Sequence, residues 1–235
     1  DHSNRDFIDG YLKKINEHKA DAASNYTMRH LFGNVINFFG AGSNTVQLSI
    51  QWHLLNCAHR VEEVQARILA EIDEVIGNER PPAWEDRNRM PFTMATIWEM
   101  YRWRTIAPLG IPRCVSKDTF LRDYFIPAGC VVMPNLWAVH MNEELWDSPQ
   151  AFKPERFLRN NCTELTQRPD QLIPFSLGKR MCPGETLATV EIFLYLTSIL
   201  QKFSVIPEEG KSIDMTAHSG TITAPTPQKL RFIPR

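Results

Sequence analysis

The chain has few cysteines, and no two of them are paired in the sequence. Five cysteines are spread over 235 residues with no Cys-x-x-Cys spacing. An odd, scattered set fits a reducing compartment better than a disulfide framework. Cys57, Cys114, Cys130 and Cys162 are therefore interpreted as ordinary thiols.

An excess of one charge is also lacking, since Lys and Arg number 26, Asp and Glu 27, and the net charge is −1. Without a basic stripe, no nucleic-acid partner is expected. There are no repeats and no glycine motif for a flavin or a nicotinamide. The most apolar stretch, residues 31–55, is interrupted by polar side chains such as Asn34 and Gln47, which argues against a membrane span. The hydrophobic content of 43% still suffices for a sizeable core.

The most informative feature is the run Pro-Phe-Ser-Leu-Gly-Lys-Arg-Met-Cys-Pro-Gly-Glu, residues 174–185. Cys182 stands just before a predicted helix with Pro183 as its first residue, and the positive end of a helix stabilises a thiolate. Gly178 and Gly184 leave room for something flat and large, so the thiolate is a candidate axial ligand of haem. A lone cysteine near a helix start is more often a small buried apolar side chain.

The spacing Phe175-x-x-Gly178-x-x-x-Cys182-x-Gly184 resembles the haem-binding loop of the cytochrome P-450 family, in the form common among animal microsomal members. The resemblance implies that Cys182 is the axial ligand of the iron of haem b, with Phe175, Gly178 and Gly184 in the cofactor-binding loop. It also implies the P-450 fold, mainly α with small β-sheets (α+β). The chain would be its C-terminal portion, from the central helix to the last strands.

Glu99 and Arg102 lie three residues apart and so share one face of a predicted helix. Their flanks are apolar, which predicts burial, and a buried ion pair needs a further partner. The family supplies one from a Pro-Glu-Arg-Phe segment, here residues 154–157. The resemblance therefore implies a structural triad of Glu99, Arg102 and Arg156 that stabilises the core behind the haem loop. Taken alone, the pair is also typical of a solvated surface ion pair.

A long helical periodicity over residues 28–60 contains Gly40 and Gly42, each of which costs about 1 kcal/mol relative to Ala inside a helix. A glycine notch for helix packing is one explanation. By resemblance this is instead the central helix that crosses the haem. Ala41 would then border the cofactor and the substrate, and the Thr45 hydroxyl would assist proton delivery during oxygen activation.

One position departs from the family pattern, because Asn44 stands where an acid usually precedes Thr45. An amide orients water and hydrogen bonds but cannot gain and lose a proton as a carboxylate does. Three consequences are open. Water held by Thr45 and Asn44 relays the proton, the substrate supplies the relay, or the enzyme is a haem-thiolate isomerase or dehydratase. The first is favoured because Thr45 is retained.

Two arginines and a few apolar residues complete the candidate site. Arg180 and Arg113 would pair with the haem propionates, because a guanidinium binds a carboxylate as a fork; an ordinary surface arginine is the alternative for each. By resemblance, a pocket for a lipophilic substrate is lined by Ala41, Ala107, Leu109, Ile111 and Ile222.

The remaining pattern predicts helices first and short strands later. Helices are expected at residues 6–19, 64–76, around Glu99 and after Pro183, with a polar connector at 79–89. Strands are expected at 119–126, 130–134 and 203–206, and a final hairpin within 221–233. We expect one domain, residues 1–235, cut from a longer chain whose N-terminal half and membrane anchor are absent.

The resemblance implies a haem-thiolate monooxygenase that inserts one atom of O2 into a lipophilic substrate. Electrons would come from NADPH through a separate flavoprotein reductase. The protein would lie at the cytoplasmic face of the endoplasmic reticulum membrane, held there by the missing anchor. A rearrangement catalyst without external reductant, and a haem-binding protein without oxygen chemistry, are the alternatives.

Overall fold

The computed structural model describes residues 4–218 and 220–235, which divide between Asn44 and Thr45 into two compact units. In the first unit, the carboxylate of Asp6 caps helix α1 (Phe7–Glu17) by accepting the Asp9 N–H at 2.9 Å. The Phe7 ring meets the Phe38 ring edge-on, with centroids 5.4 Å apart. Helix α2 (Met28–His59) begins in this unit and continues without a break into the second.

The second unit has one apolar core, to which the C-terminal half of α2 and three further helices contribute. The apolar side chains Ile68 and Ile72 of α3 (Ala66–Val75) are fully buried, as are Ile97 of α4 (Pro91–Trp103) and Phe193 and Leu196 of α6 (Glu185–Lys202). Single turns connect them: a π-helical turn η1 (Val61–Gln65), 3-10 turns η2 (Trp84–Arg89), η3 (Pro154–Phe157) and η4 (Gly178–Arg180), and the short helix α5 (Leu136–His140).

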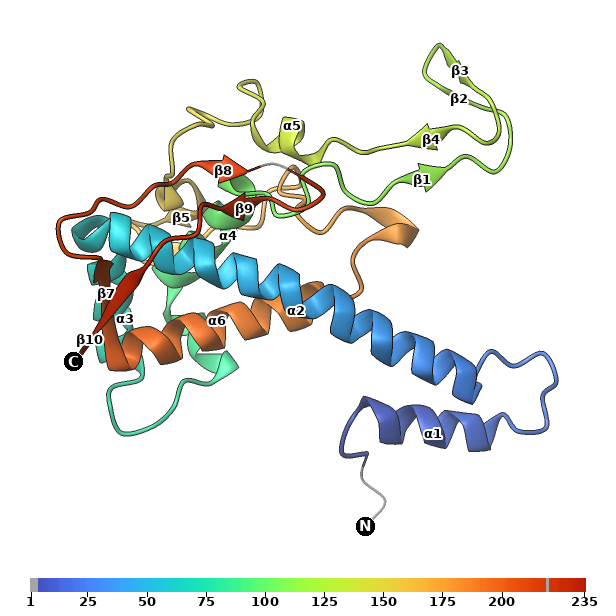
Figure 1. Ribbon diagram of the computed structural model, residues 1–235, viewed down its shortest axis with the longest axis horizontal. Coiled ribbons are helices and arrows are strands. Elements are labelled where there is room, and N and C mark those ends of the chain that lie inside the picture. Colours follow the sequence, from blue (N-terminus) through green and yellow to red (C-terminus); the bar gives the residue numbers. More distant parts are fainter. Residues whose placement is uncertain (1–3, 219) are drawn as a thin grey trace. The chain divides into compact units, whose positions relative to one another are not determined.

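Strands are short and pair antiparallel, forming five two-stranded sheets within the described part of the chain. The pairs are β1 (Arg113–Cys114) with β4 (Val131–Val132), β2 (Thr119–Leu121) with β3 (Tyr124–Ile126), β5 (Leu158–Arg159) with β6 (Glu164–Leu165), β8 (Ala217–His218) with β9 (Ala224–Pro225), and β7 (Phe203–Pro207) with β10 (Leu230–Pro234). Figure 1 shows β7 and β10 side by side at the end of α6.

Three boundaries differ from the sequence predictions. Residues 119–126 form a hairpin rather than one strand, because Arg122 turns the chain with φ = 53°. The last strand pairs with β7, and the terminal hairpin is β8–β9 instead. Helix α6 begins at Glu185 and not at Pro183, because the Ala188 N–H donates to the Gly184 oxygen at 2.8 Å and makes Gly184 the N-cap.

A thiol lies deep in this core, near the C-terminal end of α2. Cys57 is 1% exposed, and burial raises its pKa to about 12. It is therefore a protonated, uncharged packing residue at neutral pH, as expected for a small apolar side chain.

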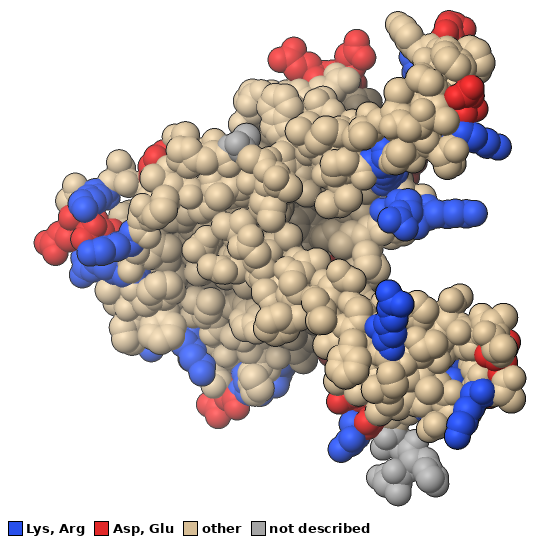
Figure 2. All heavy atoms as spheres, turned by 45° about the vertical axis from the view of Figure 1, so that its right-hand side comes forward, with Lys and Arg blue, Asp and Glu red and all other residues tan. Residues whose placement is uncertain are grey.

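Surface charge is mixed in sign. On the face drawn in Figure 2, lysine and arginine side chains lie at several separate points, with acidic side chains among them. None of the helices in the described ranges is both long enough and apolar enough to cross a membrane.

Candidate functional site

Residues 173–184, here called the cysteine loop, are held closed by their own backbone. The Cys182 N–H donates to the Phe175 oxygen at 2.8 Å, the Ser176 N–H to the Ile173 oxygen at 3.0 Å, and the Met181 N–H to the Gly178 oxygen at 3.0 Å. These bonds join both arms of the loop and enclose the 3-10 turn η4. The cysteine is thus placed by backbone hydrogen bonds and not by burial.

The loop takes two left-handed backbone conformations. Gly178 has φ = 75° and Ser176 has φ = 64°. A Cβ at Gly178 would meet no atom within 4 Å, so the backbone conformation rather than crowding accounts for this glycine. At Gly184 a Cβ would lie 3.8 Å from the Cys182 sulfur, an ordinary contact that would cover one side of it.

The thiol of Cys182 is free and exposed, two residues before the N-cap of an 18-residue helix. Unpaired N–H groups and the helix dipole favour a negatively charged sulfur at such a place. Its sequence neighbours Leu177, Met181 and Leu187 are apolar and 63%, 47% and 60% exposed. The loop therefore offers a free, exposed sulfur beside exposed apolar side chains.

Arg113 reaches this loop from strand β1, whereas Arg180 belongs to the loop itself. The Nη2 of Arg113 donates to the Ser176 hydroxyl at 2.9 Å. Arg180 ends η4 and is exposed. One predicted cation is thus positioned by a hydrogen bond to the loop, and the other by the η4 backbone.

Glu99, Arg102 and Arg156, here called the ion cluster, are brought together in the structure. Arg102 Nε and Nη2 donate to the two Glu99 oxygens at 2.8 and 2.7 Å, and both side chains are fully buried. Arg156 Nε lies 3.1 Å from Glu99 Oε2 with its side chain 9% exposed. The backbone N–H of Lys153 also donates to Glu99, at 2.8 Å. The carboxylate therefore has donors on both oxygens.

The guanidinium of Arg102 uses all of its donors. Besides Glu99, it donates to the carbonyl oxygens of His140 at 2.9 Å, Pro149 at 2.8 Å and Ala151 at 3.1 Å. A buried charge is tolerated when its hydrogen-bonding groups are satisfied in this way. His140 is the last residue of α5, and Pro149 and Ala151 lie between α5 and η3, so the arginine fixes this stretch against α4.

Tyr101, for which the sequence predicts no role in the site, links α4 to the cysteine loop. Its ring meets the Phe175 ring edge-on, with centroids 5.2 Å apart. Its hydroxyl lies 3.1 Å from Thr189 Oγ1 in α6. Burial raises the pKa of Tyr101, so the phenol stays protonated and can donate. Only a tertiary structure reveals this link, because residues 88 positions apart leave no local pattern.

Apart from Ala41 on α2, the residues predicted for the substrate wall lie on two segments that are hydrogen-bonded together. The Thr223 N–H donates to the Ile106 oxygen at 2.8 Å, which joins the segment that holds Ala107, Leu109 and Ile111 to the one that holds Ile222. Leu109 and Ile111 are 41% and 72% exposed, so their side chains are accessible.

Thr45 is the first residue of the second unit, and its side chain is partly buried. Its carbonyl oxygen accepts the Ser49 hydroxyl at 2.8 Å. Ala41 and Asn44 lie on α2 within the first unit, and α2 stays α-helical through Gly40. The roles predicted for Ala41, Asn44 and Thr45 stay predictions.

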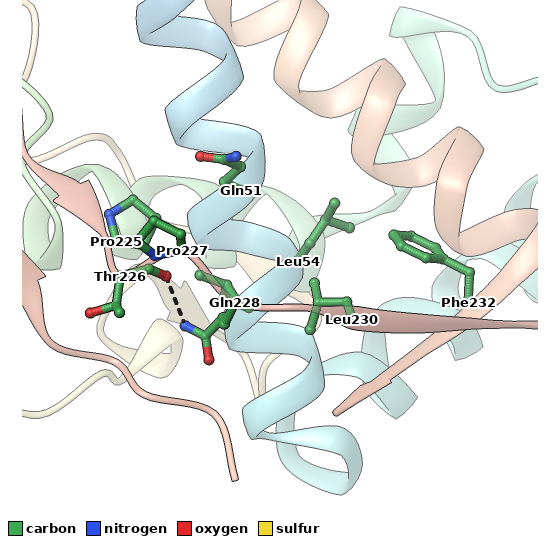
Figure 3. A pocket seen from close by; sticks show the side chains of 9 residues that line it. Gln51, Leu54, Pro225, Thr226, Pro227, Gln228, Leu230 and Phe232 are labelled. Atoms are coloured by element: carbon green, nitrogen blue, oxygen red, sulfur yellow. Dashed lines mark hydrogen bonds between the residues drawn. The ribbon is translucent and has the colours of Figure 1, made fainter. Parts of the chain in front are cut away.

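A groove of about 330 Å³ lies away from all of these residues. It is lined by the end of α2 and the terminal segment, with Leu54, Pro225 and Leu230 around it and Gln228 hydrogen-bonded to the Thr226 oxygen (Figure 3). None of the residues predicted for the cofactor or the substrate lines this groove. Within the described ranges, no three His, Cys, Asp or Glu side chains gather as a metal site.

A family model described as Cytochrome P450 matches residues 1–232. The chain belongs to the cytochrome P450 family. The predicted family, and with it the mainly α fold with small sheets, is confirmed. Relatives include "Cytochrome P450 2J1" of Oryctolagus cuniculus, 38% identical over 98% of this chain and 45% of that protein. "Cytochrome P450 2C23" of Rattus norvegicus is 39% identical over 98% of this chain and 47% of that protein. "Cytochrome P450 2A13" of Homo sapiens is 38% identical over 99% and 47%. The chain thus spans a little under half the length of these relatives.

Proposed function

We propose that Cys182 is the thiolate ligand of a haem iron, and that the protein to which this chain belongs is a monooxygenase. The closed cysteine loop is the observation that carries the proposal. Its 2.8 Å bond from the Cys182 N–H to the Phe175 oxygen holds an exposed thiol at a fixed place just before α6. Membership of the family, which implies a haem group, supports the same assignment.

The residues around the thiol fit a flat group that is apolar at its centre and anionic at its edge. The glycine at position 184 leaves one side of the sulfur uncovered by a side chain, and the exposed side chains of Leu177, Met181 and Leu187 supply apolar surface nearby in the sequence. Arg113, fixed by its bond to Ser176, and the exposed Arg180 supply guanidinium groups for two carboxylates. Together these features fit a haem b whose iron is held by a cysteine and whose two propionates meet cations.

When bound, a thiolate-ligated haem supplies an electron-rich iron that favours cleavage of the O–O bond. The chain's own residues would hold and orient the group: Cys182 through its sulfur, and Arg113 and Arg180 through the propionates. The hydroxyl of Thr45 would hold a proton at Oγ1, with Asn44 orienting water rather than exchanging protons itself. The apolar side chains of Leu109 and Ile111 favour a lipophilic substrate.

Substrates and partners of the whole protein extend this proposal. Two electrons would come from NADPH through a separate flavoprotein reductase, one atom of O2 would enter a lipophilic substrate, and the other would leave as water. The protein would act at the cytoplasmic face of the endoplasmic reticulum membrane. Asn44 supports a second candidate, a haem-thiolate isomerase or dehydratase. Turnover of a peroxide substrate without NADPH would favour that candidate, and strict dependence on the reductase would exclude it.

The test is the carbon-monoxide difference spectrum of the reduced full-length protein. We expect a strongly red-shifted Soret band in the parent, its loss in Cys182→Ser, and its retention in Cys114→Ser, which changes another exposed thiol. A spectrum typical of haem with a neutral nitrogen ligand, or no bound haem, would contradict the proposal.

A further inference from the structure

His140 ends α5 and is fully buried between the ion cluster and the cysteine loop. Its Nε2 lies 3.0 Å from the backbone N of Ile173, the first residue of the loop. Its Nδ1 lies 2.7 Å from Thr105 Oγ1, just beyond α4. Its carbonyl oxygen accepts a bond from Arg102 of the ion cluster at 2.9 Å. His140 therefore contacts the ion cluster through its carbonyl oxygen and the loop through Nε2, and its third bond, through Nδ1, goes to Thr105.

The protons of this network can be assigned from the donors alone. The Ile173 N–H can only donate, so His140 Nε2 accepts and carries no proton. A neutral imidazole then has its proton on Nδ1 and donates it to Thr105 Oγ1. The Thr105 hydroxyl is free to donate onward to the Arg102 oxygen, 3.0 Å away. Every donor in the network thus has one acceptor, so the hydrogen atoms have a single arrangement.

The imidazole is neutral in the folded protein. Burial, followed by the nearby charges of Arg102 and Arg168, lowers the pKa of His140 to about 4. The neutral form is the one that the hydrogen bonds require, because a protonated Nε2 could not accept the Ile173 N–H.

The contact with Ile173 fixes the loop at its start. Ile173 has its N–H bound to His140 and its oxygen bound to the Ser176 N–H at 3.0 Å. The next turn therefore begins from a fixed peptide, and this turn places the Ser176 hydroxyl that accepts Arg113 at 2.9 Å. The preceding carbonyl, Leu172 O, accepts Arg168 Nη2 at 3.0 Å, and Arg168 forms an ion pair with Glu185 of α6.

We propose that His140 is the positioning residue that couples the ion cluster to the cysteine loop, and so sets the orientation of the loop that bears Cys182. The part that concerns haem rests on the proposed function above. The ion cluster then has two effects: it stabilises the core behind the loop, and it positions the loop itself. Through Arg102 and His140 it determines where the loop backbone starts, and it does so without a contact to Cys182 itself.

The experiment compares three variants of the full-length protein. His140→Leu removes both ring hydrogen bonds, whereas His140→Gln keeps an amide oxygen that can accept the Ile173 N–H. His53→Leu is the matched control, because His53 is 1% exposed, lies on α2, and has no hydrogen-bond partner for either ring nitrogen among the described residues. The first readout is hydrogen exchange of the backbone over residues 173–182, which does not depend on haem chemistry. The second is the share of reduced, CO-bound protein that keeps the red-shifted Soret band.

We expect exchange over residues 173–182 to be on the order of tenfold faster in His140→Leu, since a buried hydrogen bond to the loop is lost. The red-shifted share should fall in the same variant. His140→Gln should restore both readouts in large part, and His53→Leu should change neither. Equal effects of His140→Leu and His53→Leu, or unchanged exchange in His140→Leu, would overturn the proposal.

A parent protein without the red-shifted band would contradict the proposed function and not the coupling. In that case the exchange readout alone decides whether His140 positions the loop.

Discussion

The Tyr101 phenol oxygen lies 3.1 Å from Thr189 Oγ1, and this bond ties the helix of the ion cluster to α6 immediately after the cysteine loop. The Thr189 hydroxyl donates to the Glu185 oxygen at 2.8 Å, so the phenol supplies the proton between the two side chains. Helix α4 thus contacts the loop region at two points: Phe175 through the Tyr101 ring and α6 through the Tyr101 hydroxyl.

Tyr101→Phe should therefore remove one hydrogen bond and leave the ring packing intact. We expect the free energy of unfolding to fall by about 0.5–1.5 kcal/mol. Urea unfolding of the full-length protein measures this change. Tyr195→Phe is the control on α6, because Tyr195 is 55% exposed and should give no measurable loss. Equal losses in both variants would contradict a role for the Tyr101 hydroxyl.

Arg102→Lys should be far more destabilising than an arginine-to-lysine change at the surface. Lysine offers three donors from one atom and cannot replace a planar fork that bonds both Glu99 oxygens and three carbonyls. We expect a loss of about 3–5 kcal/mol, as when a buried ion pair is broken. Arg159→Lys, in an exposed pair with Glu164, should cost at most about 1 kcal/mol. The free energy of unfolding, measured for both variants under the same conditions, tests this difference. A similar loss in both would contradict the prediction.

Gly110 meets two constraints at once. Its φ is 56°, and a Cβ there would lie 2.9 Å from Pro134 Cγ. Gly129 has a φ of 86°, but a Cβ added to Gly129 would meet no atom within 4 Å. Gly129→Ala should therefore cost about 1–2 kcal/mol for the left-handed backbone alone. Gly110→Ala should cost more, because Pro134 must also shift. Thermal unfolding that ranks the two variants in the opposite order would contradict the crowding at Gly110.

Two buried histidines predict a loss of stability below neutral pH. Burial lowers the pKa of His140 to about 4 and that of His53 to about 3, from the ordinary histidine value of 6.5. Between pH 6.5 and about 4 the unfolded chain binds a proton at His140 and the folded chain does not. Stability is therefore complete above pH 6.5 and is lost as the pH falls towards 4. For His140 the loss is on the order of 3 kcal/mol.

The measurement is the free energy of unfolding against pH for the parent and for His140→Gln. The variant should show a shallower fall between pH 6.5 and 5. The partly buried Glu71, whose pKa is raised chiefly by desolvation, is present in both proteins, so its contribution to the pH dependence cancels in the difference. Parallel curves would show that His140 does not titrate across this range on unfolding.

The sequence predicted the parts of the site that lie close together along the chain. The spacing from Phe175 to Gly184 marked the loop, and the three-residue spacing of Glu99 and Arg102 marked a shared helix face. The helical spacing of apolar residues over 28–60 likewise predicted α2. The hairpin at Arg122 was missed because a positive φ at an arginine carries no glycine or asparagine signal.

Other parts of the site depend on pairs that are distant in sequence. His140 meets Ile173 across 33 positions, and Tyr101 meets Thr189 across 88. A buried histidine at the end of a five-residue helix has no periodicity that would show its partner. In the same way, β10 pairs with β7 and not with its nearest neighbour in the chain, because strand pairing is decided by packing beside α6.

The buried thiol of Cys57 gives the protein a built-in reporter of core opening. A maleimide reacts with thiolates, and a group that is 1% exposed with a pKa of about 12 offers almost none while the core is closed. Cys114 is exposed and Cys130 and Cys162 are partly exposed, so these three thiols can be alkylated first. Any later labelling of Cys57 then counts the rare moments when α2 separates from the core, so mass spectrometry can time those openings without a dye or an engineered probe.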